Sequence, residues 1–317
     1  MRVLVAIDGS DAASMAVELV SNLGWPDGTT IDVVEAVESG MALFGGPWPA
    51  IGLVDADLLE ADVRDQAVRT VAEAAARLEG HGRNVEQRVL AGRPATVIVE
   101  EAKRSKADLI VVGSRGHGAI EEMLLGSVSA EVVDHSTVPV LVARGHAIDR
   151  VVLAWDGSPA AAAAAGLLAA WPIFGQSLVK VVSVADVRTP WWTGFPEAGS
   201  PETMTLYVEA AEGARRHADE LLTEMTGRLR AEGLAVESER REGDAAAELI
   251  AAARAWKANL VVLGTRGRTG VTRLVLGSVA RNVVHHVPSS VMIVHGLAAA
   301  TRDSSEGKVR AEAGTRG

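Results

Sequence analysis

The feature of this sequence that most constrains its fold is a glycine-containing segment that occurs twice. The first copy spans residues 108–116 (DLIVVGSRG) and is followed after nine residues by Gly126-Ser127. The second copy spans residues 259–267 (NLVVLGTRG) and is followed, again after nine residues, by Gly277-Ser278. The offset is 151 residues at each glycine (113 to 264, 116 to 267, 126 to 277). Two copies at identical spacing indicate two copies of one domain.

The order of apolar segments predicts an α/β fold in each half. Helix-forming segments separate aliphatic runs that are typical of strands covered on both faces. In the first half these runs are residues 2–7, 30–37, 84–90, 109–112 and 138–143. Such alternation requires parallel strands with right-handed crossovers. We therefore expect two tandem open parallel five-stranded sheets, each with strand order 3-2-1-4-5 and helices on both faces.

The repeat also sets the expected domain boundaries. The first domain is residues 1–145 and the second is residues 149–296, with a very short linker between them. Residues 297–317 have the composition of a disordered tail. A chain of 317 residues is long enough for two domains that each bury a core.

Composition excludes several classes of function. The chain has no cysteine, so disulfides, thiolate metal sites and a cysteine nucleophile are excluded. Its net charge of −10 argues against non-specific binding of nucleic acid. No apolar stretch reaches the length of a membrane span, and the N-terminus runs straight into a strand, without room for a signal peptide. We expect a cytoplasmic protein that binds neither nucleic acid nor a membrane.

The glycine loops predict an anion site. An open parallel sheet binds ligands at the carboxyl ends of its strands, where the strand order reverses. Glycines let backbone N–H groups approach an anion without a Cβ in the way. After the loop, Gly126-Ser127-Val128 places N–H groups at a helix N-terminus, where phosphate binds well, and Ser127 adds a hydroxyl donor.

The remainder of the predicted site would hold the rest of a nucleotide. Asp8 would repel phosphates, so we expect it to accept hydrogen bonds from a ribose or a base. The second strand, near Val37, offers backbone and apolar surface to an adenine ring. Arg115 suits phosphate charge. Two alternatives stay open: Asp8 only caps the following helix, as Ser10 also can, and Arg115 is a solvated surface residue.

Each half contributes eight candidate residues. The first set is Asp8, Val37, Gly113, Arg115, Gly116, Gly126, Ser127 and Val128. The second set is Asp156, Val184, Gly264, Arg266, Gly267, Gly277, Ser278 and Val279. We expect no catalytic residue and no metal ligand, since neither a positioned carboxylate pair for magnesium nor a repeated general base is found.

With an Ile-Asp-Gly-Ser opening at residues 7–10, the chain resembles the universal stress protein family in its tandem form, over residues 1–296. Both halves contain the G-x-x-G-x₉-G-[ST] motif, which marks the ATP-binding branch. The resemblance implies an adenine-nucleotide alpha-hydrolase-like fold, one ATP per domain, with or without Mg²⁺, and a nucleotide-dependent regulatory role in the stress response.

By position, the resemblance assigns roles to individual residues. Asp8 would contact the adenosine moiety and Val37 the adenine, while Gly113, Gly116, Gly126 and Ser127 would hold ribose and phosphates.

The resemblance also implies that the last strands of the two halves, 138–143 and 291–294, pair edge to edge within the chain. They are apolar and would otherwise be exposed edges. A homodimer of the whole chain is expected as well.

Other functions stay open at this stage. One is a slow ATPase or a phosphoryl or nucleotidyl transferase on the same scaffold. Another is a sensor of AMP or a cyclic nucleotide, because the loop binds an anion without counting phosphates. A purely structural pseudo-dimer would require both intact loops to be empty.

Overall fold

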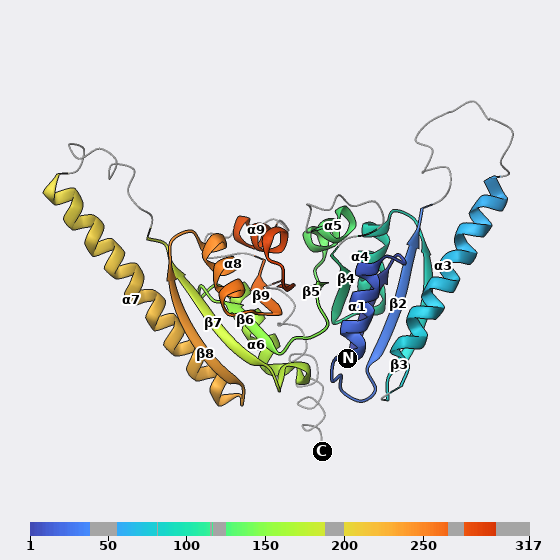
Figure 1. Cartoon of the computed structure of the whole chain (residues 1–317), viewed down its shortest axis with the longest axis horizontal. Helices are drawn as coiled ribbons and strands as arrows, with labels where there is room; N and C mark the ends of the chain where they lie inside the picture. Colours follow the sequence, from blue (N-terminus) through green and yellow to red (C-terminus); the bar gives the residue numbers. More distant parts are fainter. Residues whose placement is uncertain are drawn as a thin grey trace, which may run out of the picture.

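The structure is a computed structural model (Figure 1) that describes residues 1–38, 56–80, 82–114, 116, 125–187, 200–265 and 276–295. The predicted tail, 297–317, lies outside the described residues.

Both halves contain the predicted strands and helices in the predicted order. The first half consists of β1 (Arg2–Ile7), α1 (Asp11–Asn22), β2 (Thr30–Val37), α3 (Ala56–Leu78), β3 (Asn84–Ala91), α4 (Pro94–Ser105), β4 (Leu109–Gly113), α5 (Ser127–His135) and β5 (Val140–Ala143). The second half consists of β6 (Arg150–Ala154), α6 (Pro159–Ala170), the 3₁₀ helix η1 (Pro172–Phe174), β7 (Leu178–Ala185), α7 (Pro201–Ala231), β8 (Ala235–Glu242), α8 (Ala245–Ala255), β9 (Leu260–Gly264), α9 (Ser278–His286) and β10 (Ser290–Val294).

The strand β5 begins two residues later than the sequence predicts. The Ser136 hydroxyl donates to the Val138 carbonyl (2.7 Å) and accepts from the Val138 N–H (3.0 Å). This local turn holds Val138 outside the ladder, and Pro139 follows it without an N–H to donate.

The strands form one sheet of ten, in the order β3-β2-β1-β4-β5-β10-β9-β6-β7-β8. Each half therefore has the predicted order 3-2-1-4-5, which confirms the fold class. The β5–β10 pair is antiparallel, with Val291 opposite Val142 and Ile293 opposite Val140. The predicted pairing of the two last strands is confirmed, and it joins the two sheets into one.

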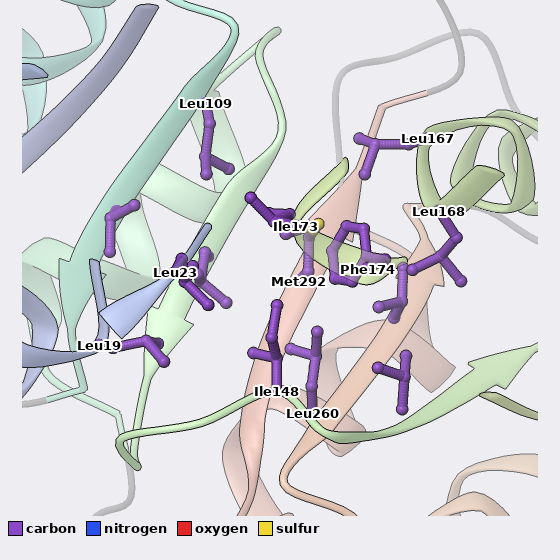
Figure 2. Close-up of a cluster of buried hydrophobic side chains, with 14 of the residues drawn as sticks. Leu19, Leu23, Leu109, Ile148, Leu167, Leu168, Ile173, Phe174, Leu260 and Met292 are labelled. Carbon is purple, nitrogen blue, oxygen red and sulfur yellow. The ribbon is translucent and has the colours of Figure 1, made fainter. Parts of the chain in front are cut away.

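Helices cover both faces of this sheet (Figure 1). On one face, α1, α3, α6 and α7 pack against it, and on the other face α4, α5, α8 and α9 do so. The core on the first face continues across the junction of the halves, where Ile148, Leu23 and Met292 lie in one buried cluster (Figure 2). Burial of one such aliphatic side chain stabilises the folded state by about 1.5–3 kcal/mol. The residues at the junction therefore contribute to the stability of the folded chain.

The carboxyl end of β4 lies unusually close to the first helix. A Cβ added to Gly113 would lie 2.7 Å from the Ala12 carbonyl carbon and 2.9 Å from the Ala13 nitrogen. In the second half, a Cβ added to Gly264 would lie 2.6 Å from the Cβ of Ala160. Glycine is therefore required here for packing, because it lets β4 and β9 approach the first turns of α1 and α6.

A buried carboxylate lies under α4 in the first half. The side chain of Asp32 is 0% exposed, and the guanidinium of Arg2 is 3.4 Å away. Among the described residues, neither carboxylate oxygen of Asp32 has a hydrogen-bond partner. Burial raises the pKa of Asp32, and the positive charge of Arg2 only partly opposes this. The ionised carboxylate is therefore destabilising in the folded state.

We predict that Gly113→Ala and Gly264→Ala each lower the free energy of unfolding by roughly 1–3 kcal/mol, because the added methyl group meets helix atoms that cannot easily move. Urea denaturation measures the change. Gly24→Ala is the control, since nothing lies within 4 Å of its added Cβ, and we expect a change of about 0.5 kcal/mol or less. Equal stability of Gly113→Ala and the wild type would contradict the packing requirement.

We predict that Asp32→Asn raises the free energy of unfolding at neutral pH, since it removes a buried charge. With its raised pKa, the folded state binds the Asp32 proton at a higher pH than the unfolded state does. The wild type therefore gains stability as the pH falls through that pKa, and the advantage of the variant shrinks over the same window. Urea denaturation across a pH series measures both effects.

The control for this experiment is Asp219→Asn, which changes a carboxylate that is 54% exposed and paired with Arg240. We expect a change of about 0–1 kcal/mol for it. A less stable Asp32→Asn protein at neutral pH would show that the Arg2 ion pair outweighs the cost of burial.

Candidate functional site

The predicted residues converge at the point of each half where the strand order reverses. The strands β1 and β4 are parallel neighbours, as are β6 and β9. Asp8 directly follows β1 and Gly113 ends β4, so both lie at the carboxyl edge of the sheet. Asp156 and Gly264 occupy the same places in the second half. This is the edge at which open parallel sheets bind ligands.

Each aspartate accepts a backbone hydrogen bond within the loop that follows the first strand of its half. One Asp8 oxygen accepts the Ser10 N–H (3.0 Å), and one Asp156 oxygen accepts the Ser158 N–H (2.9 Å). The serine hydroxyls, rather than the aspartates, cap the following helices, by accepting the N–H of Ala13 and of Ala161. Asp8 is therefore not the side-chain cap of α1, and its carboxylate instead holds the turn before the helix.

The second carboxylate oxygen of Asp8 faces the glycine loop. It is the atom nearest to the position that a Cβ on Gly116 would occupy. The structure therefore brings Asp8 and Gly116 together across about a hundred residues of sequence, and a side chain at 116 would collide with the carboxylate. Asp8 is exposed, so this oxygen lies where hydroxyl or amino donors of a ligand can reach it.

The helices α5 and α9 begin without a side-chain cap. Their N-cap residues, Gly126 and Gly277, make no side-chain hydrogen bond, and neither does Arg93 before α4, whereas serine or aspartate side chains cap α1, α6, α7 and α8. Ser127, Val128 and Ser278 are exposed in the first turns. Open helix N-termini bind anions through backbone N–H groups and the helix dipole.

In each half, one backbone N–H group that was predicted to bind an anion already donates a hydrogen bond within the chain. The Gly126 N–H donates to the Ser114 carbonyl (2.7 Å), and the Gly277 N–H donates to the Thr265 carbonyl (2.8 Å). These bonds close the loop onto the helix, so the N–H groups that face outward begin at Ser127 and Ser278. Both glycines have extended backbone, with φ of −76° and −63°, so they are not required by a left-handed conformation.

Val184, predicted to lie beside the adenine in the second half, is not the structural counterpart of Val37. Val37 ends β2, and its carbonyl accepts the Gly92 N–H (2.9 Å). The matching bond in the second half runs from the Gly243 N–H to the carbonyl of Ala185, which ends β7 (3.1 Å). Ala185 therefore corresponds to Val37. A shift of one residue in a strand turns the side chain to the other face, so Val184 packs against the α8–α9 side of the core.

Three predicted residues, Arg115, Arg266 and Gly267, lie outside the described residues. Val279, in the first turn of α9, is half-buried.

One further contact at the site could not be predicted from the sequence. The hydroxyl of Ser129, buried in the first turn of α5, donates to the Gly113 carbonyl (2.7 Å). It ties the end of β4 to the helix that follows the loop. The second half has Ala280 in this position, and there the Thr265 N–H donates instead to the Val294 carbonyl of β10 (3.0 Å). A small hydroxyl residue inside a helix has no distinguishing pattern.

Within the described ranges, no group of three or more His, Cys, Asp or Glu side chains could hold a metal ion. None of the helices in that part of the chain combines the length and the apolar character needed to cross a membrane.

Comparisons with known proteins agree with the repeat. The sequence model of the Universal stress protein family matches residues 1–144 and 147–295. A universal stress protein of Mycolicibacterium smegmatis is 27% identical over 299 residues, which cover 92% of this chain and 96% of that protein. Universal stress protein YxiE of Bacillus subtilis is 33% identical over 147 residues, 45% of this chain and 98% of that protein.

A solved structure shares the fold over most of the chain. The crystal structure of a universal stress protein from Archaeoglobus fulgidus covers 93% of this chain and 98% of its own, with a TM-score of 0.63 and 21% sequence identity. Each half has the adenine-nucleotide alpha-hydrolase-like fold. Together, these matches show that the chain belongs to the universal stress protein family and contains two family domains in tandem.

Proposed function

We propose that each half binds one ATP, with or without Mg²⁺, and that occupancy regulates the protein in the stress response. In each site the phosphates lie at the N-terminus of α5 or α9. The adenosine lies toward Asp8 or Asp156, with Val37 or Ala185 beside the base. The protein acts in the cytoplasm as a homodimer, and ATP serves as a ligand rather than a substrate.

The observation that carries this proposal is the pair of open helix N-termini, each beside an aspartate at the reversal point of the sheet. Gly126 and Gly277 leave the first turns of α5 and α9 without a side-chain cap, and the first residues of these helices, Ser127 and Ser278, are exposed. A phosphate group satisfies such N–H groups and the positive end of the helix dipole. The carboxylates at Asp8 and Asp156 repel phosphate but accept hydrogen bonds from hydroxyl and amino groups. A ligand with an anionic end and a hydroxyl-bearing end fits both.

Two features favour a binding protein over an enzyme. The halves share the residues of the anion site, whereas the loops differ where a catalytic carboxylate would stand: Glu121-Glu122 in the first half correspond to Thr272-Arg273 in the second. A reaction common to both sites would need a common base.

The test uses Ser127→Asp and Ser278→Asp. An aspartate in the first turn stabilises a helix by about 0.3–1 kcal/mol, so both variants fold, but its charge repels phosphate. Like charges about 4 Å apart repel by about 1–4 kcal/mol, so we expect a loss of affinity of roughly tenfold or more in the altered half. Isothermal titration with ATP should give two sites of wild-type affinity for the wild type, one for each single variant and none for the double variant, with each altered site weaker by that factor.

The matched controls are Ser127→Asn and Ser278→Asn, which have nearly the same shape without the charge. We expect affinities within roughly threefold of the wild type for them. Equal losses with Asn and Asp would assign the effect to shape rather than to repulsion of phosphate. Titrations with AMP and a cyclic nucleotide test the alternative ligands, and accumulation of ADP that stops in the double Asp variant would favour an enzyme.

A further inference from the structure

Arg144 belongs to the first half, but its backbone N–H and its guanidinium donate hydrogen bonds to the second half. Arg144 directly follows β5, and its backbone N–H donates to the Ser290 hydroxyl at the start of β10 (3.0 Å). Its guanidinium donates to the carbonyls of Val284 (2.5 Å), Val287 (3.1 Å) and Ser289 (3.2 Å). These carbonyls belong to the end of α9 and to the turn that connects it with β10.

This contact anchors the C-terminal end of α9. The last carbonyls of a helix have no intrahelical partner and carry the negative end of the helix dipole. A guanidinium offers five N–H donors in a fixed plane, and here it satisfies three carbonyls with one side chain. The end of α9 is thus held by a cation of the other half, while its N-terminus is the proposed phosphate site of its own half.

In the first half, different hydrogen bonds follow the C-terminal end of the corresponding helix, α5. Ser136 follows α5, and its hydroxyl completes a local turn by bonding both the N–H and the carbonyl of Val138. The second half has Val287 in this position, which has no hydroxyl, and its carbonyl is one of those bonded by Arg144. Among the described residues, α9 is not followed by such a serine turn, and its end is bonded by Arg144 and, from its own half, by Arg254.

The other charged groups near α9 leave Arg144 as the main anchor. Arg281 and Asp134 link α9 to α5 at 3.1 Å, but both side chains are partly exposed, and such pairs contribute little. Burial lowers the pKa of His285, as do the neighbouring His286, Arg281 and Arg144, while Asp134 opposes them, so the neutral imidazole is favoured. Arg254 of α8 bonds the His286 carbonyl (3.2 Å) from an exposed position.

We propose that Arg144 is a positioning residue for the nucleotide site of the second half, so that this site depends on the first half. The inference rests on the proposed function. The helix has only nine residues, so anchoring one end of α9 orients the N–H groups of Ser278 and Val279 at the other end. The site of the first half, at α5, has no such dependence on Arg144.

The experiment measures each site alone. Ser127→Asp leaves only the second site at full affinity, and Ser278→Asp leaves only the first. In these two chains, Arg144→Met removes the charge but keeps most of the stem. We expect the ATP affinity of the second site to fall roughly 5- to 100-fold and that of the first site to change less than twofold. Arg144→Lys keeps the charge but lacks the planar fork of donors, so we expect it to lose less ATP affinity at the second site than Arg144→Met does.

A second readout needs no nucleotide. Hydrogen exchange of the amides in residues 281–286 of α9 should speed up in Arg144→Met, while residues 130–135 of α5 stay as in the wild type. Equal losses of ATP affinity at both sites, or an equal increase in the amide exchange rates of α5 and α9, would overturn the inference. If neither single-site chain binds ATP while exchange in α9 still increases, the proposed function fails and the anchoring by Arg144 stands.

Discussion

The antiparallel ladder between β5 and β10 is the interaction on which the rest of the structure depends. Each half alone would end its sheet with a short apolar edge, and unpaired apolar edges promote association. Pairing the two edges within the chain makes one sheet of ten strands and lets the core continue across the junction, around Ile148 and Met292. It also brings α5 and α9 close enough for groups of one half to contact the helix of the other. The two candidate sites are therefore parts of one folded unit.

Within this frame, the geometry of each site follows from a few close contacts. Gly113 and Gly264 let the fourth strand of each half approach the first helix, which sets where the loop begins. Asp8 and Asp156 brace the adjacent turn with one oxygen, and Asp8 keeps the other toward Gly116. Glycine caps leave α5 and α9 open at their N-termini. The repeat thus places the same groups in both halves. The hydrogen bond of Ser129 in the first half and the contact of Arg144 with the end of α9 are contacts in which the halves differ.

Much of this could be predicted from the sequence, because local patterns decide it. Aliphatic runs that end in glycine predicted the strands, and alternation with helices predicted their order. The error at Val184 arose because the sequence pairs valine with valine, whereas the second strands end Ala36-Val37 in one half and Val184-Ala185 in the other. The packing role of Gly113 and the anchoring by Arg144 could not be predicted. Both depend on distances between segments about a hundred or more residues apart, which exist only once the sheet has formed.

The most direct test of the account is the number of ATP molecules that the wild-type chain binds at saturation. Equilibrium titration with ATP, followed by analysis of the nucleotide recovered from the complex, measures this number and shows whether ATP stays intact. We predict two ATP per chain, recovered without conversion to ADP. The absence of saturable binding would contradict its central claim and leave the fold without the proposed ligand.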